Sequence, residues 1–144
     1  MPSLDLEHCT MLLGLSPQEK ERIISLAETR LYQPGEHLIE ENHPHGQLFL
    51  ILEGEVQVKA TTSDQREEVL LVLGPGQVVG EIELLDNGPP PATVEASQPT
   101  RVLAFPGRAL LDFCAAHPHI GYRLMRNLAE SIGFKIRYHN LSLR

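Results

Sequence analysis

Between residues 32 and 106 the chain alternates short apolar runs with glycine turns, and this pattern constrains the fold most. Pro34-Gly35 and Pro75-Gly76 place glycine where a type II turn needs a positive φ. The strand-sized runs are Leu48–Leu52, Val56–Val58, Val69–Leu73, Ala92–Ala96 and Arg101–Phe105. Short strands at close spacing predict a β-sandwich or β-roll. We expect the first two runs to form a hairpin around Glu53-Gly54-Glu55.

Helical patterns flank these runs on both sides. Ser16-Pro17-Gln18-Glu19 combines a capping residue, proline in the first turn and a glutamate that can close a capping box. Apolar residues then continue at helical spacing up to Leu31, at Ile23, Ile24, Ala27 and Leu31. A shorter helix is expected over Asp5 to Leu13. After Gly107, one apolar helical face contains Leu110, Leu111 and Cys114, and Pro118 is expected to start a helix that runs to about Tyr138.

The expected organisation is a single domain over residues 1–144. It is mainly β with flanking α, divided into N-terminal helices (1–31), a β-roll (32–106) and C-terminal helices (107–144). A chain of 144 residues is long enough to bury one core. We predict no membrane span, because no apolar run approaches 18 residues. With no secretory signal and only Cys9 and Cys114, the sequence predicts a reduced, cytoplasmic protein.

The chain resembles the cyclic-nucleotide-binding domain family, the effector domains of catabolite-activator-type regulators, kinase regulatory subunits and gated channels. The resemblance spans roughly residues 10–138. It is carried by Tyr32-Gln33-Pro34-Gly35-Glu36, Leu48 to Val58, Leu73-Gly74-Pro75-Gly76, Val79-Gly80-Glu81-Ile82, Leu84-Leu85 and Ala92-Thr93-Val94. It implies an eight-stranded β-roll, also described as a jelly roll, with helices before it and a long helix after it.

The resemblance also implies a phosphate-binding cassette inside the roll. In the family a Gly-Glu pair opens the cassette and its glutamate binds the ribose hydroxyl. A short helix then presents N–H groups to the cyclic phosphate, which an arginine neutralises. Gly80 and Glu81 match the pair, whereas Pro90 falls on the arginine position and Glu83 stands where a small residue is usual. The candidate ligand-binding residues are Gly80, Glu81, Ile82, Glu83, Leu84, Pro90, Pro91, Ala92 and Thr93.

The charge of this segment argues against a cyclic phosphate. Residues 76–100 contain four acidic side chains and no lysine or arginine, and the prolines at 89–91 offer no N–H. We therefore interpret Gly80-Glu81 as a tight backbone position followed by a carboxylate that caps the next turn. The cassette is predicted to be degenerate, with cAMP and cGMP disfavoured and no other cofactor expected.

The sequence predicts a non-catalytic regulatory module that senses another ligand or docks on a protein partner. One alternative is a functional cyclic-nucleotide sensor with an unconventional phosphate site. Arg66 and Arg101 are the arginines that could in principle reach such a site from another strand, although nothing in the sequence shows that they do. A second is a metal-binding, cupin-like enzyme that uses His43 and His45. A site of that kind needs a glutamate a few residues after the histidine pair, where this sequence has the apolar run Leu48–Leu52. It also needs a histidine in the second half, but none lies between His45 and His117. We expect no catalytic residues and no metal site.

The apolar positions of the last helix predict how copies of the chain assemble. In catabolite-activator-type regulators this helix pairs with its copy, and the apolar positions Met125, Leu128, Ile132 and Ile136 lie near one line. We expect a homodimer through them. Because the sequence ends at Arg144, DNA recognition by this chain alone is not expected. The net charge of -7 also disfavours nonspecific nucleic-acid binding, although residues 120–144 hold five basic groups and one acidic group. These basic groups are interpreted as a solvated face or a complement to the acidic roll of another subunit.

Overall fold

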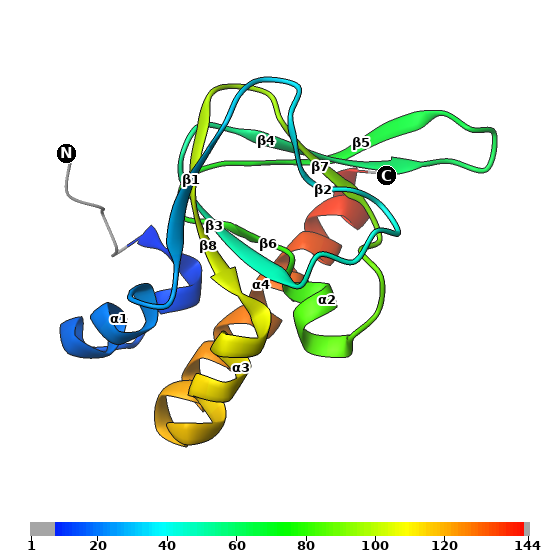
Figure 1. The fold of residues 1–144 in the computed structure, drawn as a ribbon. Helices are drawn as coiled ribbons and strands as arrows, with labels where there is room; N and C mark the ends of the chain where they lie inside the picture. The colour runs from blue at the N-terminus through cyan, green and yellow to red at the C-terminus, as the bar shows by residue number, and fades with distance from the viewer. Residues whose placement is uncertain (1–7, 143–144) are drawn as a thin grey trace.

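Two four-stranded antiparallel sheets form the centre of the molecule (Figure 1). The computed structural model describes residues 8–142. One sheet has the strand order β1-β8-β3-β6, and the other has the order β2-β7-β4-β5. The strands are β1 Glu28–Tyr32, β2 His37–Ile39, β3 Gln47–Glu53, β4 Val56–Thr61, β5 Glu67–Leu73, β6 Val78–Val79, β7 Thr93–Ala96 and β8 Thr100–Pro106. This is the β-roll that the turn pattern predicts.

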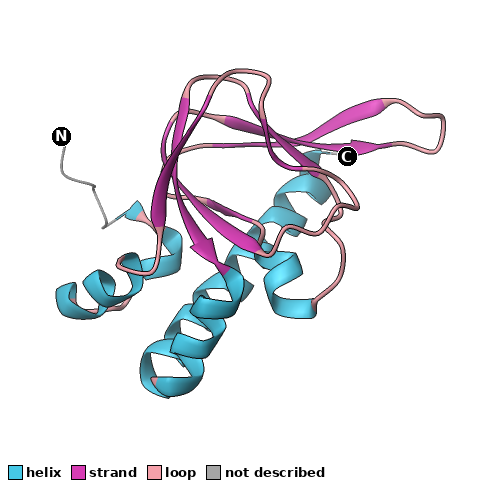
Figure 2. Cartoon of the chain, in the orientation of Figure 1, coloured by secondary structure: helices cyan, strands magenta, loops and turns pink. Residues whose placement is uncertain are grey.

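Helices lie before, within and after the roll in the sequence and gather on one side of the strands (Figure 2). They are the 3₁₀ turn η2 Thr10–Leu12 and the α-helices α1 Pro17–Ile24, α2 Glu81–Asp86, α3 Gly107–Ala116 and α4 Pro118–Ser142. The capping box is present: Ser16 Oγ accepts from the Glu19 N–H at 3.1 Å, and Glu19 Oε1 accepts from the Ser16 N–H at 2.8 Å. Helix α4 begins at Pro118 as predicted.

The N-terminal helices are shorter than predicted. Helix α1 ends at Ile24, and β1 starts at Glu28, so the boundary expected after Leu31 lies four residues too late. Leu31 is exposed on β1, where it pairs with Arg101 of β8. Backbone pairing with β8 therefore overrides the helical spacing of the apolar residues. In the described part of the segment Asp5–Leu13, the 3₁₀ turn Thr10–Leu12 forms in place of an α-helix, and residues 5–7 lie outside the described part.

The expected hairpin around Gly54 does not form. β3 pairs with β6 and β8, whereas β4 pairs with β5 and β7, so the turn carries the chain from one sheet to the other. Gly54 has a φ of 98°, and a Cβ there would lie 2.4 Å from the Pro99 carbonyl oxygen. Only glycine fits this corner without displacing backbone. The sequence pattern locates the turn but cannot show which sheet each flanking strand joins.

Two apolar clusters meet at β3. Phe49 and Ile51 face the other sheet, and Leu48 and Leu50 face the helices, because successive side chains on a strand point to opposite faces. The helix-side cluster includes Ile23, Phe105, Leu110, Leu124 and Leu128, all fully buried. Burial on both faces explains why β3 is a continuous apolar run rather than an alternating one. The roll and α4 therefore form one packed unit, with the cassette at its edge.

Candidate functional site

A cavity of about 240 Å³ lies between the second sheet, the 80–92 segment and α4. Its walls are mostly apolar, from side chains such as Ile39, Val58, Leu71 and Val94. The predicted cassette residues Gly80, Glu81, Ile82, Glu83, Pro90, Pro91 and Ala92 also line it. Leu84 is instead buried in the helix-side core, and the Thr93 hydroxyl accepts from the Glu41 N–H at 3.0 Å.

Gly80 sets the position of the short helix α2. Its φ is 94°, and a Cβ there would lie 2.5 Å from the Gln47 carbonyl oxygen on β3. The left-handed conformation turns the chain directly from β6 into α2, and Leu84 anchors the helix to the core. The prediction that a tight backbone position occurs here is confirmed.

The Glu81 carboxylate pairs with a cation from the far end of the chain. Lys135 Nζ on α4 lies 2.7 Å from Glu81 Oε2 and donates to the Val78 carbonyl oxygen at 2.5 Å. The two side chains are 4% and 13% exposed for Glu81 and Lys135. The predicted role of Glu81, capping the next turn, is therefore wrong. Figure 1 shows α2 beside the C-terminal half of α4, which makes the contact possible.

The Glu83 carboxylate is held by backbone donors. Gly46 N–H donates to Oε2 at 2.5 Å, and His45 N–H lies 3.2 Å from both carboxylate oxygens. The Glu83 side chain is only 11% exposed. Among the lysines and arginines of the described residues, none forms an ion pair with it. A carboxylate held by backbone N–H groups, without a lysine or arginine partner among the described residues, therefore borders the cavity.

His45 lies beside Glu83 and has one unsatisfied ring nitrogen. Nδ1 accepts from the Gln47 N–H at 3.1 Å, so the proton of the neutral ring is on Nε2. Nε2 is buried, is 3.7 Å from Glu83 Oε1, and finds no hydrogen-bond partner within the described residues. The ring stacks on Phe49 at 5.7 Å. Burial lowers the pKa of His45 despite the opposing effect of Glu83, which keeps the ring neutral at pH 7.

The arginines considered for an unconventional phosphate site lie elsewhere. Arg66 pairs with Asp64 at 3.3 Å in the exposed β4–β5 loop, and Arg101 pairs with Glu53. Neither lines the cavity, so neither supplies a cation to the cassette. Pro90 is buried in the wall, where its carbonyl oxygen accepts from the Asn42 N–H at 2.9 Å.

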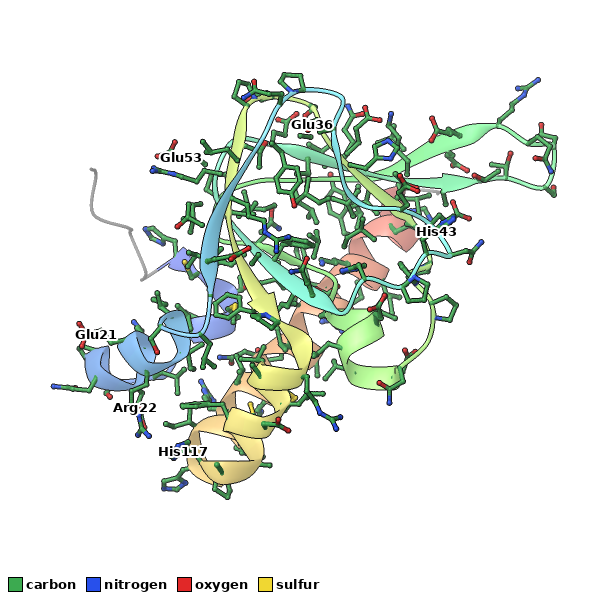
Figure 3. All side chains as sticks on the ribbon, viewed as in Figure 1. Glu21, Arg22, Glu36, His43, Glu53 and His117 are labelled. Carbon is green, nitrogen blue, oxygen red and sulfur yellow. The ribbon has the colours of Figure 1, made fainter. Side chains whose placement is uncertain are left out.

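His43 and His45 do not share a site. His43 is exposed on the loop after β2 (Figure 3), and its Nδ1 lies 2.8 Å from the Glu41 carbonyl oxygen. His45 is directed to Phe49 and Glu83 instead. Within residues 8–142, no group of three or more His, Cys, Asp or Glu side chains is arranged to hold a metal ion.

The predicted interface residues differ in how much of each side chain is exposed to solvent. Leu128 is fully buried in its own chain's core and offers no surface to a second copy. Met125 and Ile132 are half-buried, and Ile136 is 56% exposed beside the cavity. Sequence reasoning missed Lys135 as a site residue, because the spacing of charges on a helix does not reveal which other segment the helix covers.

The other basic residues of the tail stay on or near α4. Arg123 Nε donates to the Leu13 carbonyl oxygen at 3.1 Å, and Arg126 pairs with Glu130. Lys135 does complement the acidic roll, but within its own chain. Arg144 lies outside the described residues. Among the helices that the structure describes, none has the length and apolarity required to cross a bilayer.

Comparison with known proteins agrees with this geometry. A family model described as cyclic nucleotide-binding domain matches residues 29–117. The cyclic AMP receptor protein of Thermus thermophilus is 30% identical over 130 residues, which are 90% of this chain and 58% of that protein. The chain spans between 16% and 58% of the length of the curated relatives that it matches.

Solved structures match over nearly the whole chain. A cyclic nucleotide-binding domain from Methylobacillus flagellatus superposes with a TM-score of 0.85 at 25% identity, covering 93% of this chain and 79% of that one. A mutant regulatory subunit of a cAMP-independent protein kinase A from Trypanosoma brucei, bound to cAMP in its A site, gives 0.80 at 25% identity, with 96% and 49% covered. That mutant replaces a glutamate with alanine and, seven and eight positions later, a threonine with arginine and a valine with alanine.

Proposed function

The chain belongs to the cyclic nucleotide-binding domain family, and we propose that it is a non-catalytic regulatory module that does not bind cyclic nucleotides tightly. The observation that carries this proposal is the charge around the cavity. Glu83 borders it without a lysine or arginine partner among the described residues, and Pro90 stands at the arginine position. The module responds instead to another ligand or to a protein partner.

The pairing of Lys135 supports the same conclusion. Lys135 is a cation that lines the cavity, and its ammonium group is already engaged by Glu81 and the Val78 carbonyl oxygen. A cyclic phosphate would have to draw Lys135 away from a buried carboxylate to gain a charge partner. The ribose would compete for that same carboxylate. Both steps oppose cyclic nucleotide binding.

The trypanosome mutant offers a second line of support. Its replaced glutamate is followed by its new arginine and new alanine at the spacing that separates Glu83 from Pro90 and Pro91. The unmodified kinase is described as cAMP-independent, and the mutant is bound to cAMP. A carboxylate and a missing arginine at this spacing therefore accompany cAMP independence in a relative.

We expect no change in thermal unfolding when cAMP or cGMP is added at about 1 mM. A ligand present at one hundred times its Kd stabilises a protein by about 2.7 kcal/mol, a shift that differential scanning fluorimetry resolves. The anionic phosphate meets Glu83, and the lysine that lines the cavity, Lys135, is already paired with Glu81. A saturable rise in Tm with either nucleotide would contradict the proposal and favour an unconventional phosphate site.

We further propose that the chain forms a homodimer through α4. Met125, Ile132 and Ile136 lie along one flank of the helix, at the position that pairs in catabolite-activator-type regulators. Ile136 is a large aliphatic side chain exposed on this flank, and covering it with a second copy would remove apolar surface from water. A dimer of this kind would link any change at the cavity to the relative position of two copies.

Ile136→Glu is expected to convert a dimer into a monomer in sedimentation velocity experiments. Phe134→Glu is the matched control, since Phe134 is 52% exposed and lies about 160° away around the helix, on the other flank. The Ile136 variant places a charge in the proposed contact, whereas the Phe134 variant leaves that contact intact. A monomeric wild-type protein, or equal effects of both variants, argues against this interface.

A further inference from the structure

One wall of the cavity is a row of apolar side chains on three neighbouring strands. Val58 of β4 lies opposite Leu71 of β5 on one side and opposite Val94 of β7 on the other. Residues directly opposite each other on neighbouring strands share one face of a sheet, and all three line the cavity. Ile136 of α4 also lines it, and this side chain is 56% exposed. A ligand in this space therefore meets contiguous apolar surface.

The polar side chains of the lining are already engaged by other parts of the protein. Lys135 Nζ lies 2.7 Å from the carboxylate of Glu81. Both oxygens of Glu83 accept from backbone N–H groups, those of His45 and Gly46. The Nε2 atom of His45 is buried and is not presented to the cavity. To form a strong hydrogen bond with one of these groups, a ligand would have to compete with a contact that the fold already makes.

The charges of the lining favour neither an anion nor a cation. Glu81, Glu83 and Lys135 are charged at pH 7, His45 is neutral, and His139 is the remaining ionisable side chain. The net charge of the lining is therefore -1 with His139 neutral and zero with His139 protonated. An anion would approach Lys135 and His139 but also both carboxylates, whereas a cation would approach the carboxylates but also Lys135. Either ion would lose hydration in a mostly apolar space, a cost that a neutral molecule avoids.

The volume of the cavity sets the size of the ligand. The cavity measures about 240 Å³, whereas an apolar cavity of about 150 Å³ holds benzene. It lies below the range of about 300–1,000 Å³ that is usual for pockets for drug-sized molecules. A substituted ring or a branched chain of about seven to ten non-hydrogen atoms therefore suits the space. Water is held weakly in an apolar space, and displacing it with an apolar group gains affinity.

We propose that the cavity binds a small, neutral, apolar molecule, a single substituted ring or a compact branched chain, through apolar contacts alone. This inference rests on the proposed function, because it names the ligand to which the module responds. Ile136 of α4 lines the cavity, so the ligand contacts the same helix that we propose pairs with its copy. Occupancy of the cavity thereby bears on the position of α4.

The test compares four compounds that share one ring and differ in a single substituent. Toluene, benzyl alcohol, benzoate and benzylammonium are titrated into the ¹⁵N-labelled, unmodified protein at pH 7 and followed by amide chemical shifts. Toluene is expected to bind saturably with a Kd of about 1 mM or lower, with shifts at Val58, Leu71 and Val94. Benzyl alcohol is expected to bind more weakly than toluene, because its hydroxyl gives up hydrogen bonds to water. The two ions are expected to bind at least about tenfold more weakly.

A matched pair of variants tests the location. Val58→Phe places a larger side chain on the half-buried wall of the cavity and is expected to weaken toluene binding at least about tenfold, since the phenyl ring occupies the space. Val72→Phe makes the same change on β5, where Val72 is 52% exposed and does not line the cavity, and is expected to leave binding unchanged. Thermal unfolding of both variants without ligand checks that they fold.

Four results would overturn the inference. They are no saturable toluene binding, benzyl alcohol that binds more tightly than toluene, an ion that binds as tightly as toluene, and a folded Val58→Phe variant with unchanged toluene affinity. Tight benzoate binding in particular would assign Lys135 and His139 as partners of an anionic ligand. The first three results need no variant. Titration of cAMP in parallel separates the two proposals: saturable cAMP binding contradicts the proposed function, whereas failure of toluene without cAMP binding contradicts only the ligand class.

Discussion

Replacing Glu83, Pro90 and Pro91 with alanine, arginine and alanine is expected to raise cAMP affinity about a thousandfold or more. The new guanidinium can make two hydrogen bonds to the phosphate, each worth about 1.5–3 kcal/mol when a charged group is involved. Removing Glu83 also deletes the repulsive carboxylate. About 4 kcal/mol corresponds to a thousandfold change in Kd. Calorimetric titration of the triple variant beside the wild type measures the gain.

Two further variants separate the contributions. Glu83→Ala alone removes the repulsion but supplies no cation, and we expect it to gain far less than the triple variant. Because Glu83 accepts from His45 and Gly46 N–H, its loss leaves these donors without their acceptor. Glu83→Gln with Pro90→Arg keeps an acceptor at that position and adds the cation. If both arginine variants fold and neither binds cAMP, Pro90 does not occupy the phosphate subsite.

Lys135→Met is expected to lower the free energy of unfolding by about 3 kcal/mol. Removing one partner of a buried ion pair leaves an uncompensated charge and costs about 3–5 kcal/mol in general. Glu81 would become that charge, since its side chain is only 4% exposed and its carboxylate bonds to Lys135. Urea unfolding followed by circular dichroism measures the change. Hydrogen exchange over residues 133–139 reports whether the C-terminal half of α4 is released from the cassette.

Matched variants make the Lys135 result specific. Arg126→Met breaks the exposed pair with Glu130 on the same helix and is expected to cost about 1 kcal/mol or less. The double variant Lys135→Met/Glu81→Gln removes both charges, and we expect it to recover most of the lost stability. Equal effects of Lys135→Met and Arg126→Met would show that the buried pair does not hold α4 on the cassette.

The fold was predictable because its signals are local. Glycine at Gly35, Gly54 and Gly76 adopts positive φ, as the turn interpretation requires, and each apolar run became a strand. Sequence could not decide which strands pair. The run before Gly54 joins one sheet and the run after it joins the other, and this depends on contacts with distant β8 and β7.

From the sequence, site residues could be predicted only within the segment 80–92. Gly80 to Glu83 and Pro90 to Ala92 do line one cavity. Lys135 and His45 come from other parts of the chain, and nothing in their spacing signals that α4 covers the cassette or that the loop before β3 turns its histidine towards Glu83. Residues 76–100 contain no lysine or arginine, as the sequence shows, but the cavity that they border does contain a lysine. That lysine, Lys135, comes from α4.

The pairing of β1 with β8 sets a condition on how the molecule folds. Glu28 lies opposite Ala104 and Tyr32 opposite Thr100, so the first strand closes against the last one. Contacts between residues so far apart in sequence are slow to form. A long loop must close first, and the entropy that this costs is lost before the contacts stabilise the fold. During synthesis, β1 must wait until β8 has left the ribosome. Until β8 is available, β1 lacks its only partner among the described strands of the sheet, and an unpaired strand edge is a site at which chains associate.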